Sequence, residues 1–267
     1  MTSLFRNGLV SISFRNWSPE EIIDALEPLP MEGIEWGGDS HVPHGDIKTA
    51  MRIGKLTREA GLEPFSYGSY YRFREVDPSA GEPDPAIDAV LDTAEALGSR
   101  RIRVWAGEMD FEEANASYQQ AIAERAREVA ELASKRGLVI DLEFHGGTLN
   151  NSALNSLKLL AQIDHTNVRT LWQPVMDLPL KDRLDGLKLL LPHISNLHCF
   201  HWGPGGFHDR RQLAEGMADW RAYLEGLQES GQPRWISLEF VRGDSLDSLE
   251  KDSRTLAELT GGDFRYA

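Results

Sequence analysis

The chain is poor in several features that would each define a class of protein. Its 267 residues include one cysteine, Cys199, so an internal disulfide is excluded and nothing points to an oxidising compartment. Lys and Arg number 28 against 42 Asp and Glu, and the resulting net charge of −14 does not suit phosphate backbones or anionic membrane surfaces. No apolar run reaches the roughly 18 residues of a membrane span. We therefore expect a cytoplasmic protein without nucleic-acid or membrane partners.

What the sequence does contain is a regular alternation of short apolar runs with longer amphipathic segments. Each short run has the length and composition of a buried strand, and a helical pattern follows each one. The predicted strands cover residues 9–13, 33–36, 62–67, 101–105, 138–144, 168–173, 194–200 and 235–241.

Eight strand–helix units in one chain predict parallel strands joined by right-handed crossovers. At this length they favour an α/β fold with a single domain over residues 1–267, a (β/α)₈ TIM barrel. The alternative is an open doubly wound sheet, which would carry a Gly-rich phosphate turn after its first strand. Residues 11–21, SISFRNWSPEE, contain no such turn, so the barrel is the better interpretation.

Capping signals mark the ends of the predicted helices. Residues 18–21 form a capping box with Pro19 at the first helical position. The third helix is predicted over residues 84–98, beginning at Asp-Pro and ending at Gly, and the fourth over 117–137. The last helix is predicted over residues 245–260, before a Gly-Gly pair.

Polar side chains end the last four predicted strands. In a TIM barrel the chemistry lies at the carboxyl ends of the strands, and successive side chains alternate between the inside and the outside of the barrel. If the apolar residues of each strand face the helices, Ile236, Leu238 and Phe240 among them, four polar residues point inward near the mouth. These are Glu143, Gln173, His198 and Glu239.

Two carboxylates, an imidazole and an amide oxygen are all competent ligands for a divalent cation. Two inward carboxylates without a partner would repel each other, and a metal ion removes that cost. For each residue alone, a structural role is the more common explanation. It is the convergence of four residues at one depth that predicts a metal site.

The stretch VIDLEFHGG, residues 139–147, places further ionisable groups on the inward face of the fifth strand. Asp141 lies one layer deeper than Glu143, and we expect it to be structural, with Arg103 and Glu35 as partners in a buried ion-pair cluster. His145 lies at the rim, where it could either contact the substrate or make a supporting hydrogen bond.

Four motifs make the chain resemble the xylose-isomerase-like TIM barrels, the sugar isomerase and epimerase superfamily. They are LEFHGGT (142–148), WQP (172–174), NLHCFHWG (196–203) and ISLEF (236–240), and the resemblance covers nearly the whole chain. It implies a divalent metal, most often Mn²⁺ with Mg²⁺, Co²⁺ or Zn²⁺ as alternatives, held by Glu143, Gln173, His198 and Glu239. Gln173 departs from the family, which usually has Asp there. Asp177 follows closely and is an alternative ligand.

Six further residues are predicted to bind substrate, because they lie at or just beyond strand ends. Aromatic side chains at such positions suit the C–H faces of a sugar, although packing is the commoner role for each alone. The candidates are His145, His201, Arg242, Trp105, Trp36 and Tyr70, with Trp202 as a further aromatic residue of the same kind. Arg242 could bind a carboxylate or phosphate, or pair with Asp244 at the rim.

The resemblance implies a metal-dependent sugar isomerase or epimerase, with Glu143 and Glu239 as the acid and base of proton abstraction next to a carbonyl. Two alternatives remain open. One is a lyase or hydrolase acting on keto-sugars or keto-glycosides in the same site, and the other is a non-catalytic sugar-binding barrel. The expected partner is a small sugar or sugar derivative, and a homo-oligomer is left open.

Overall fold

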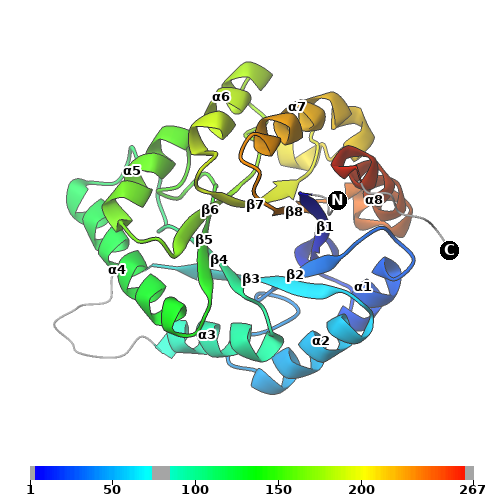
Figure 1. Ribbon diagram of the computed structural model, residues 1–267, viewed down its shortest axis with the longest axis horizontal. Helices are drawn as coiled ribbons and strands as arrows, with labels where there is room; N and C mark the ends of the chain where they lie inside the picture. Colours follow the sequence, from blue (N-terminus) through cyan, green and yellow to red (C-terminus); the bar gives the residue numbers. More distant parts are fainter. Residues whose placement is uncertain (1–3, 74–84, 262–267) are drawn as a thin grey trace.

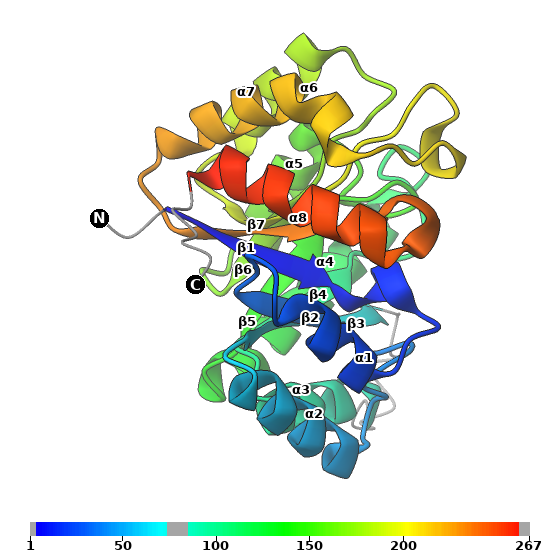
Figure 2. The ribbon, with the colours of Figure 1, turned by 90° about the vertical axis from the view of Figure 1, so that its right-hand side faces the viewer.

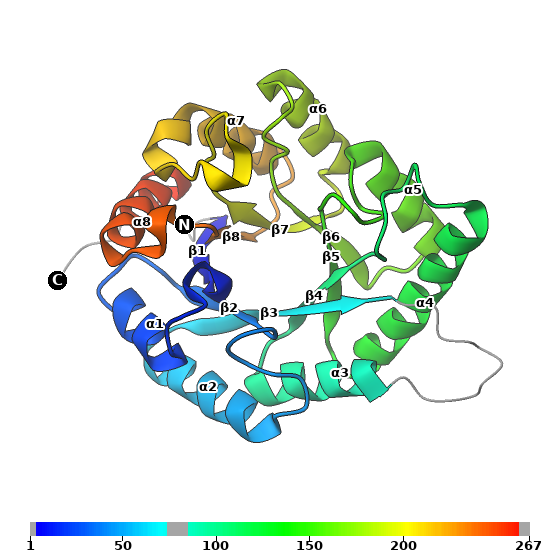
Figure 3. The same cartoon turned by 180° about the vertical axis from the view of Figure 1, so that it is seen from behind.

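The computed structural model describes residues 4–73 and 85–261, and within these ranges the chain forms one closed barrel. Figure 1 looks down the barrel, with the strands at the centre and the helices in an outer ring, and Figure 3 shows the same ring from behind. The strands are β1 (Phe5–Val10), β2 (Gly33–Gly37), β3 (Glu63–Arg72), β4 (Arg101–Trp105), β5 (Val139–Glu143), β6 (Val168–Trp172), β7 (Ile194–Cys199) and β8 (Arg234–Leu238).

All strand pairs are parallel, and β8 pairs with β1 to close the barrel. The helices of the outer ring are α1 (Pro19–Leu26), α2 (Ile47–Glu59), α3 (Pro85–Leu97), α4 (Ala116–Lys135), α5 (Ala153–Ile163), α6 (Leu180–Leu190), α7 (Met217–Gln228) and α8 (Leu246–Thr260). Seen from the side, α8 lies along β1 (Figure 2). The predicted (β/α)₈ barrel is therefore confirmed.

The core lies between the barrel and the helix ring. Ile34, Val104, Ile140 and Leu197 point outward from their strands and are fully buried against the helices. Burial of such side chains contributes about 1.5–3 kcal/mol each. The parity inferred from the apolar residues is thus correct over these strands, which leaves the opposite face of each strand to the barrel interior.

The helix ends follow the predicted capping chemistry where the structure describes them. The Ser18 side chain accepts the backbone N–H of Glu21, and the Glu21 side chain accepts the N–H of Ser18. Gly98 and Gly261 have positive φ angles at the ends of α3 and α8, a conformation that glycine adopts without strain. Asp84 and Gly262, also predicted as helix boundaries, lie outside the described residues.

Three strands differ from the prediction by three residues or more at a boundary. The first strand covers residues 5–10 rather than 9–13, because residues Ser11–Phe14 turn into a 3₁₀ helix. The third strand continues to Arg72, and the eighth ends at Leu238 rather than at residue 241. The last difference changes the direction of Phe240, which matters for the site.

None of the helices within residues 4–73 and 85–261 combines the length and apolarity needed to cross a bilayer.

Candidate metal centre and its surroundings

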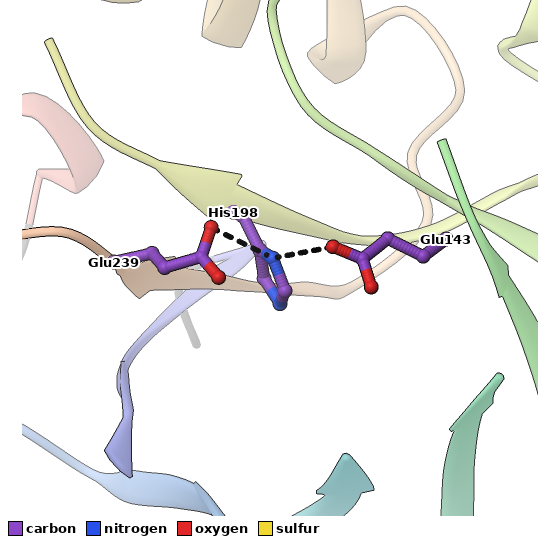
Figure 4. Close-up of side chains that lie close together, drawn as sticks. All are labelled: Glu143, His198 and Glu239. Carbon is purple, nitrogen blue, oxygen red and sulfur yellow. Dashed lines mark ion pairs between the residues drawn. The ribbon is translucent and has the colours of Figure 1, made fainter. Parts of the chain in front are cut away.

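Three predicted ligands meet at the carboxyl ends of β5, β7 and β8. Figure 4 shows the imidazole of His198 between the carboxylates of Glu143 and Glu239. His198 Nδ1 lies 3.1 Å from Oε2 of Glu239 and 3.9 Å from Oε1 of Glu143, and one ligand atom from each residue falls within 4.8 Å of the other two. All three residues are at most 3% exposed. The structure therefore brings these three candidates together as a possible cation site.

Gln173 lies directly after β6 and is also buried. Its side-chain amide nitrogen donates to the backbone oxygen of Phe144 at 2.8 Å, which fixes the orientation of the amide group. Its Oε1 atom is buried and has no hydrogen-bond partner in the described part of the chain. Asp177, the alternative ligand, lines the neighbouring cavity and is not part of the buried carboxylate–imidazole group.

The unpaired atoms of this site fit a cation. Oε1 of Gln173 is buried and makes no hydrogen bond within residues 4–73 and 85–261, and Nδ1 of His198 and Oε2 of Glu239, 3.1 Å apart, are buried and pair with each other only if Nδ1 is protonated. Buried polar atoms are normally satisfied, because each one left without a partner costs about 1–3 kcal/mol. A divalent ion would satisfy oxygen and imidazole donors of this kind together.

The charges around His198 also favour a bound cation. Burial alone lowers the pKa of His198, but the carboxylates of Glu239 and Glu35 outweigh burial and raise this pKa to about 10. The site therefore favours positive charge between its carboxylates. A bound metal ion would supply that charge and would take Nδ1 of a neutral imidazole as its ligand.

A buried arginine connects the site to β2. Arg103 donates from Nε to Glu35 at 2.6 Å and from a terminal nitrogen to Oε2 of Glu143. Its guanidinium passes over Gly68, where an added Cβ would meet it at 2.5 Å, so a side chain at residue 68 would displace Arg103. Burial raises the pKa of Glu143, but Arg103 and His198 outweigh burial and lower it, which keeps Glu143 ionised.

The predicted ion-pair cluster is correct for Arg103 and Glu35 but wrong for Asp141. Asp141 pairs instead with Arg101, whose Nε and a terminal nitrogen each lie 2.6 Å from the carboxylate. Arg103 pairs with Asp141 in backbone register, but its side chain extends upward to Glu143. Asp141 is buried one layer below the site, as expected of a structural residue.

Three of the predicted substrate-binding residues lie together beside Glu143. Trp105 donates its indole N–H to Oε2 of Glu143, and the imidazole of His145 stacks on the indole with ring centroids 4.4 Å apart. The ring of Tyr70 lies under the Arg103 guanidinium, 4.3 Å from its Cζ atom, and meets Trp105 edge-on. Trp105 thus holds Glu143 directly, which aromatic position alone did not indicate.

The other three predicted substrate-binding residues lie elsewhere. Trp36 is fully buried and donates its indole N–H to Thr57 of α2, so it belongs to the layer between barrel and helices. His201 packs against Gly216 at the start of α7, because it is one of the outward residues after β7. The structure therefore contradicts Trp36 as a substrate contact, whereas a substrate contact of His201 stays a prediction. Arg242 is exposed on a 3₁₀ turn after β8, and Asp244 pairs with Arg210 at 2.8 Å.

A cavity of about 240 Å³ opens beside Gln173, on the side of β6 and β7. His145, Phe200, Trp202 and Phe207 are among the residues that line it. The sequence prediction missed Phe200 and Phe207. Phe240 was predicted to face the helices, but it packs on Phe200 and Trp202 instead. The signal that could have found Phe207 is the turn-rich segment GPGG before it, which follows directly after a ligand-bearing strand.

Fold and site together define a (β/α)₈ barrel with a buried Glu–His–Glu group at the carboxyl ends of its strands. The chain belongs to the family described as xylose isomerase-like TIM barrel, whose sequence profile matches residues 23–259. This agrees with the resemblance carried by the four motifs.

Individual proteins extend the comparison. The 3-dehydroshikimate dehydratase of Bacillus anthracis is 26% identical over 282 aligned positions, which cover 93% of this chain and 95% of that protein. The structure of IolI protein with a bound zinc atom has a TM-score of 0.78 at 16% identity and covers 97% of this chain and 99% of that one. D-psicose 3-epimerase from Clostridium cellulolyticum H10, solved with D-tagatose, has a TM-score of 0.67 at 16% identity and covers 96% and 95%. At these identities the two structures bear on the fold alone.

Proposed function

We propose that this protein is a divalent-metal-dependent enzyme that removes a proton next to the carbonyl group of a sugar or sugar derivative. The observation that carries the proposal is the convergence of Glu143, His198 and Glu239 at one buried point, with Oε1 of Gln173 buried and unpaired after the neighbouring strand. When bound there, a metal ion would polarise the carbonyl oxygen and so make the neighbouring C–H group more acidic.

The two carboxylates have different surroundings, which suggests different roles. Glu143 is held at Oε2 by Arg103 and Trp105. Among the described residues no arginine or tryptophan donates to Glu239, whose Oε2 atom faces Nδ1 of His198 at 3.1 Å. We assign proton removal to Glu239, which no arginine or tryptophan holds, and return of a proton to Glu143, which first takes one up from solvent because it is ionised at rest. Removal and return at one carbon gives epimerisation, and return at the neighbouring carbon gives isomerisation.

A screen in D₂O tests this proposal. The Mg²⁺-supplemented protein is incubated with a panel of ketoses, aldoses and keto-glycosides, and each is followed by proton NMR. We expect at least one compound to lose a C–H signal next to its carbonyl, and Glu239→Gln to reduce that rate by about 10²–10⁴-fold. A native rate in Glu239→Gln would contradict the assigned role. Sugar binding with no exchange in any compound would favour a non-catalytic binding barrel.

A lyase is the second candidate, and two observations favour it. The 26% identical relative is a dehydratase, and a dehydratase removes water from its substrate. The unequal surroundings of Glu143 and Glu239 also suit a reaction that needs one strong base rather than two equivalent ones. In this reaction Glu239 removes the proton, the C–H electrons form a carbon–carbon double bond, and the group on the next carbon departs with its bonding pair. Glu143, after taking up a proton from solvent, would supply it to that group, and Glu239 would release its proton to solvent.

The product separates the two candidates. An isomerase or epimerase returns a compound of unchanged mass apart from deuterium. A lyase produces an unsaturated carbonyl compound with new ultraviolet absorbance, together with the released group. Mass spectrometry of the active reaction from the D₂O screen therefore distinguishes them in one experiment.

A further inference from the structure

Four aromatic side chains that follow β7 and β8 form a wall at the mouth of the barrel. Phe200 stacks on Trp202 with ring centroids 4.4 Å apart. Phe240 lies 5.4 Å from Trp202 and 5.2 Å from Phe207, and the rings of Phe207 and Phe240 are nearly perpendicular. We call Phe200, Trp202, Phe207 and Phe240 the aromatic wall. The proton chemistry proposed for Glu143 and Glu239 uses none of the four.

The loop that carries the wall is held in place by its own hydrogen bonds. Trp202 and Arg210 form an isolated antiparallel bridge, and Gly203 donates its backbone N–H to the oxygen of Asp209 at 2.8 Å. The Asp209 carboxylate pairs with Arg211 at 2.5 Å. The wall is therefore preformed, and a ligand could bind to it without the entropic cost of ordering the loop.

Phe240 reaches the wall at a conformational cost. Its φ angle is +55°, a region that bulky L-residues rarely adopt because it is sterically strained. This conformation follows directly after Glu239, so Glu239 points into the barrel while the next side chain joins the mouth instead of the helix layer. The Arg210 guanidinium covers the rings of Phe207 and Phe240 at 4.6 and 5.2 Å, and Asp244 holds it at 2.8 Å. Strain of this kind is concentrated at ligand sites.

The cavity in front of the wall is mostly apolar. Beyond Phe200, Trp202 and Phe207, most of its lining comes from Phe144, Pro174, Val175, Met176, Gly146 and Gly206. Gln173, a candidate metal ligand, lies at the same cavity. Phe207 is 43% exposed and lines the cavity, so part of its ring is open to a ligand. A molecule bound at the metal centre can therefore place an apolar substituent against the wall.

We propose that the cavity and its aromatic wall form a second subsite, which binds a flat apolar group carried by the substrate. An aryl aglycone of a keto-glycoside is a group of this class, whereas a free ketose or aldose has none. The inference rests on the proposed function for the position of the reacting head group. It deepens that function by selecting conjugated rather than simple sugars as the substrate class.

The test compares two small probes with the same head group. 2-Hydroxyacetophenone and hydroxyacetone share an α-hydroxy ketone and differ in a phenyl against a methyl group. Their dissociation constants are measured by calorimetry with the Mg²⁺-supplemented full-length protein. We expect the aryl probe to bind at least tenfold more tightly, in line with aromatic contacts of this kind. Equal binding of the two probes, or no binding of either, would overturn the proposal.

Two wall variants and a matched control localise the effect. Phe207→Ala removes a half-exposed ring that lines the cavity. Phe240→Gly removes the ring that packs on Trp202 and Phe207, and glycine adopts the φ angle of +55° at this position without strain. Each should reduce the preference for the aryl probe to less than threefold. Leu189→Ala removes a similarly exposed apolar side chain, 46% exposed on α6 and outside the cavity lining, and should leave the preference unchanged. An undiminished preference in both wall variants would place the aryl group elsewhere and overturn the subsite.

The same probes separate this inference from the proposed function. In D₂O the exchange of the protons next to the carbonyl reports the proposed chemistry, independently of affinity. Preference for the aryl probe without exchange supports the subsite and contradicts the enzyme assignment. Exchange of both probes at equal affinity supports the enzyme and contradicts the subsite.

Discussion

Nε2 of His198 lies 3.4 Å from Oε1 of Glu35, on the side of the imidazole opposite the two carboxylates that Nδ1 faces. Glu35 is fully buried and also accepts the Nε–H of Arg103, which in turn holds Glu143. One carboxylate on β2 therefore orients two of the candidate ligands. A carboxylate next to the outer nitrogen of a metal-binding histidine fixes the ring and its tautomer.

Replacing Glu35 should weaken metal binding although Glu35 is not itself a candidate ligand. Because outer-shell carboxylates contribute about 10–100-fold to metal affinity, we expect Glu35→Gln to raise the Kd for Mn²⁺ by that factor. Calorimetric titration of the substrate-free protein measures it. Asp141→Asn is the matched control, since it breaks a buried ion pair one layer deeper and should leave the Mn²⁺ Kd unchanged. Native Mn²⁺ affinity in Glu35→Gln would show that Glu35 does not support metal binding.

Gln173→Asp should have the opposite effect on the metal. Gln173 is neutral, so Glu143 and Glu239 are the carboxylates around the proposed ion, and Asp would add a third negative charge next to it. We expect tighter Mn²⁺ binding, measured by the same titration. Its dependence on ionic strength should be weak, because the group is buried. If the affinity stays the same or falls, the unpaired Oε1 atom of Gln173 does not bind the ion.

The two tryptophans that were predicted to bind substrate should respond differently to replacement by phenylalanine. Trp105→Phe removes the N–H group that donates to Glu143, and a lost hydrogen bond to a charged group is worth about 1.5–3 kcal/mol. We expect kcat to fall by about tenfold or more on the substrate found in the D₂O screen. Trp36→Phe should lower the free energy of unfolding and leave kcat within about twofold, because its hydrogen bond is to Thr57 of α2. A kcat effect from Trp36→Phe that exceeds the effect from Trp105→Phe would contradict this placement.

We expect Asp252 to make the free energy of unfolding depend on pH. Burial raises the pKa of Asp252 from 3.8 to about 6, partly opposed by the backbone N–H of Leu213 that its carboxylate accepts at 2.8 Å. The folded chain therefore holds this proton more tightly than the unfolded chain. As pH rises from about 4 to about 6 the unfolded state releases the proton first, so the free energy of unfolding falls over that range.

Asp252→Asn should abolish this contribution, because the amide oxygen can still accept the Leu213 N–H and carries no charge. Urea unfolding at pH 4.5 and pH 7.5 should show the variant gaining stability relative to the native chain at the higher pH. An equal difference between the two proteins at both values would mean that Asp252 does not titrate in this range.

Much of the site could be predicted from the sequence because it depends on the alternation within single strands. Glu143 and His198 point into the barrel since their apolar neighbours Leu142, Leu197 and Cys199 are buried against the helices. That rule needs no knowledge of neighbouring strands. The resemblance to the family, carried by motifs at the ends of β5 to β8, pointed to the same residues.

The remaining features depend on where strands end and on how far side chains reach. The β8 strand ends at Leu238, and the positive φ angle of Phe240 then turns its ring to the mouth, against the alternation rule. Arg103 extends past Asp141, its register partner, and donates to Glu143. This choice of partner depends on the length of the arginine side chain and on the space over Gly68, which strand alternation does not reveal. Because side chains alternate along β2, Glu35 lies inside the barrel and Trp36 lies outside it. The prediction of Trp36 as a substrate contact did not take this alternation into account.

The most direct test of the central claim is a crystal structure of the protein grown with Mn²⁺, with anomalous diffraction used to locate the ion. We expect one strong anomalous peak between Glu143, His198 and Glu239, on the Nδ1 side of the imidazole and next to Oε1 of Gln173. The peak should be absent from crystals of His198→Ala prepared in the same way. A fully ordered native site without a peak, with Nδ1 of His198 bonded to Glu239 instead, would contradict the assignment of this group as a metal centre.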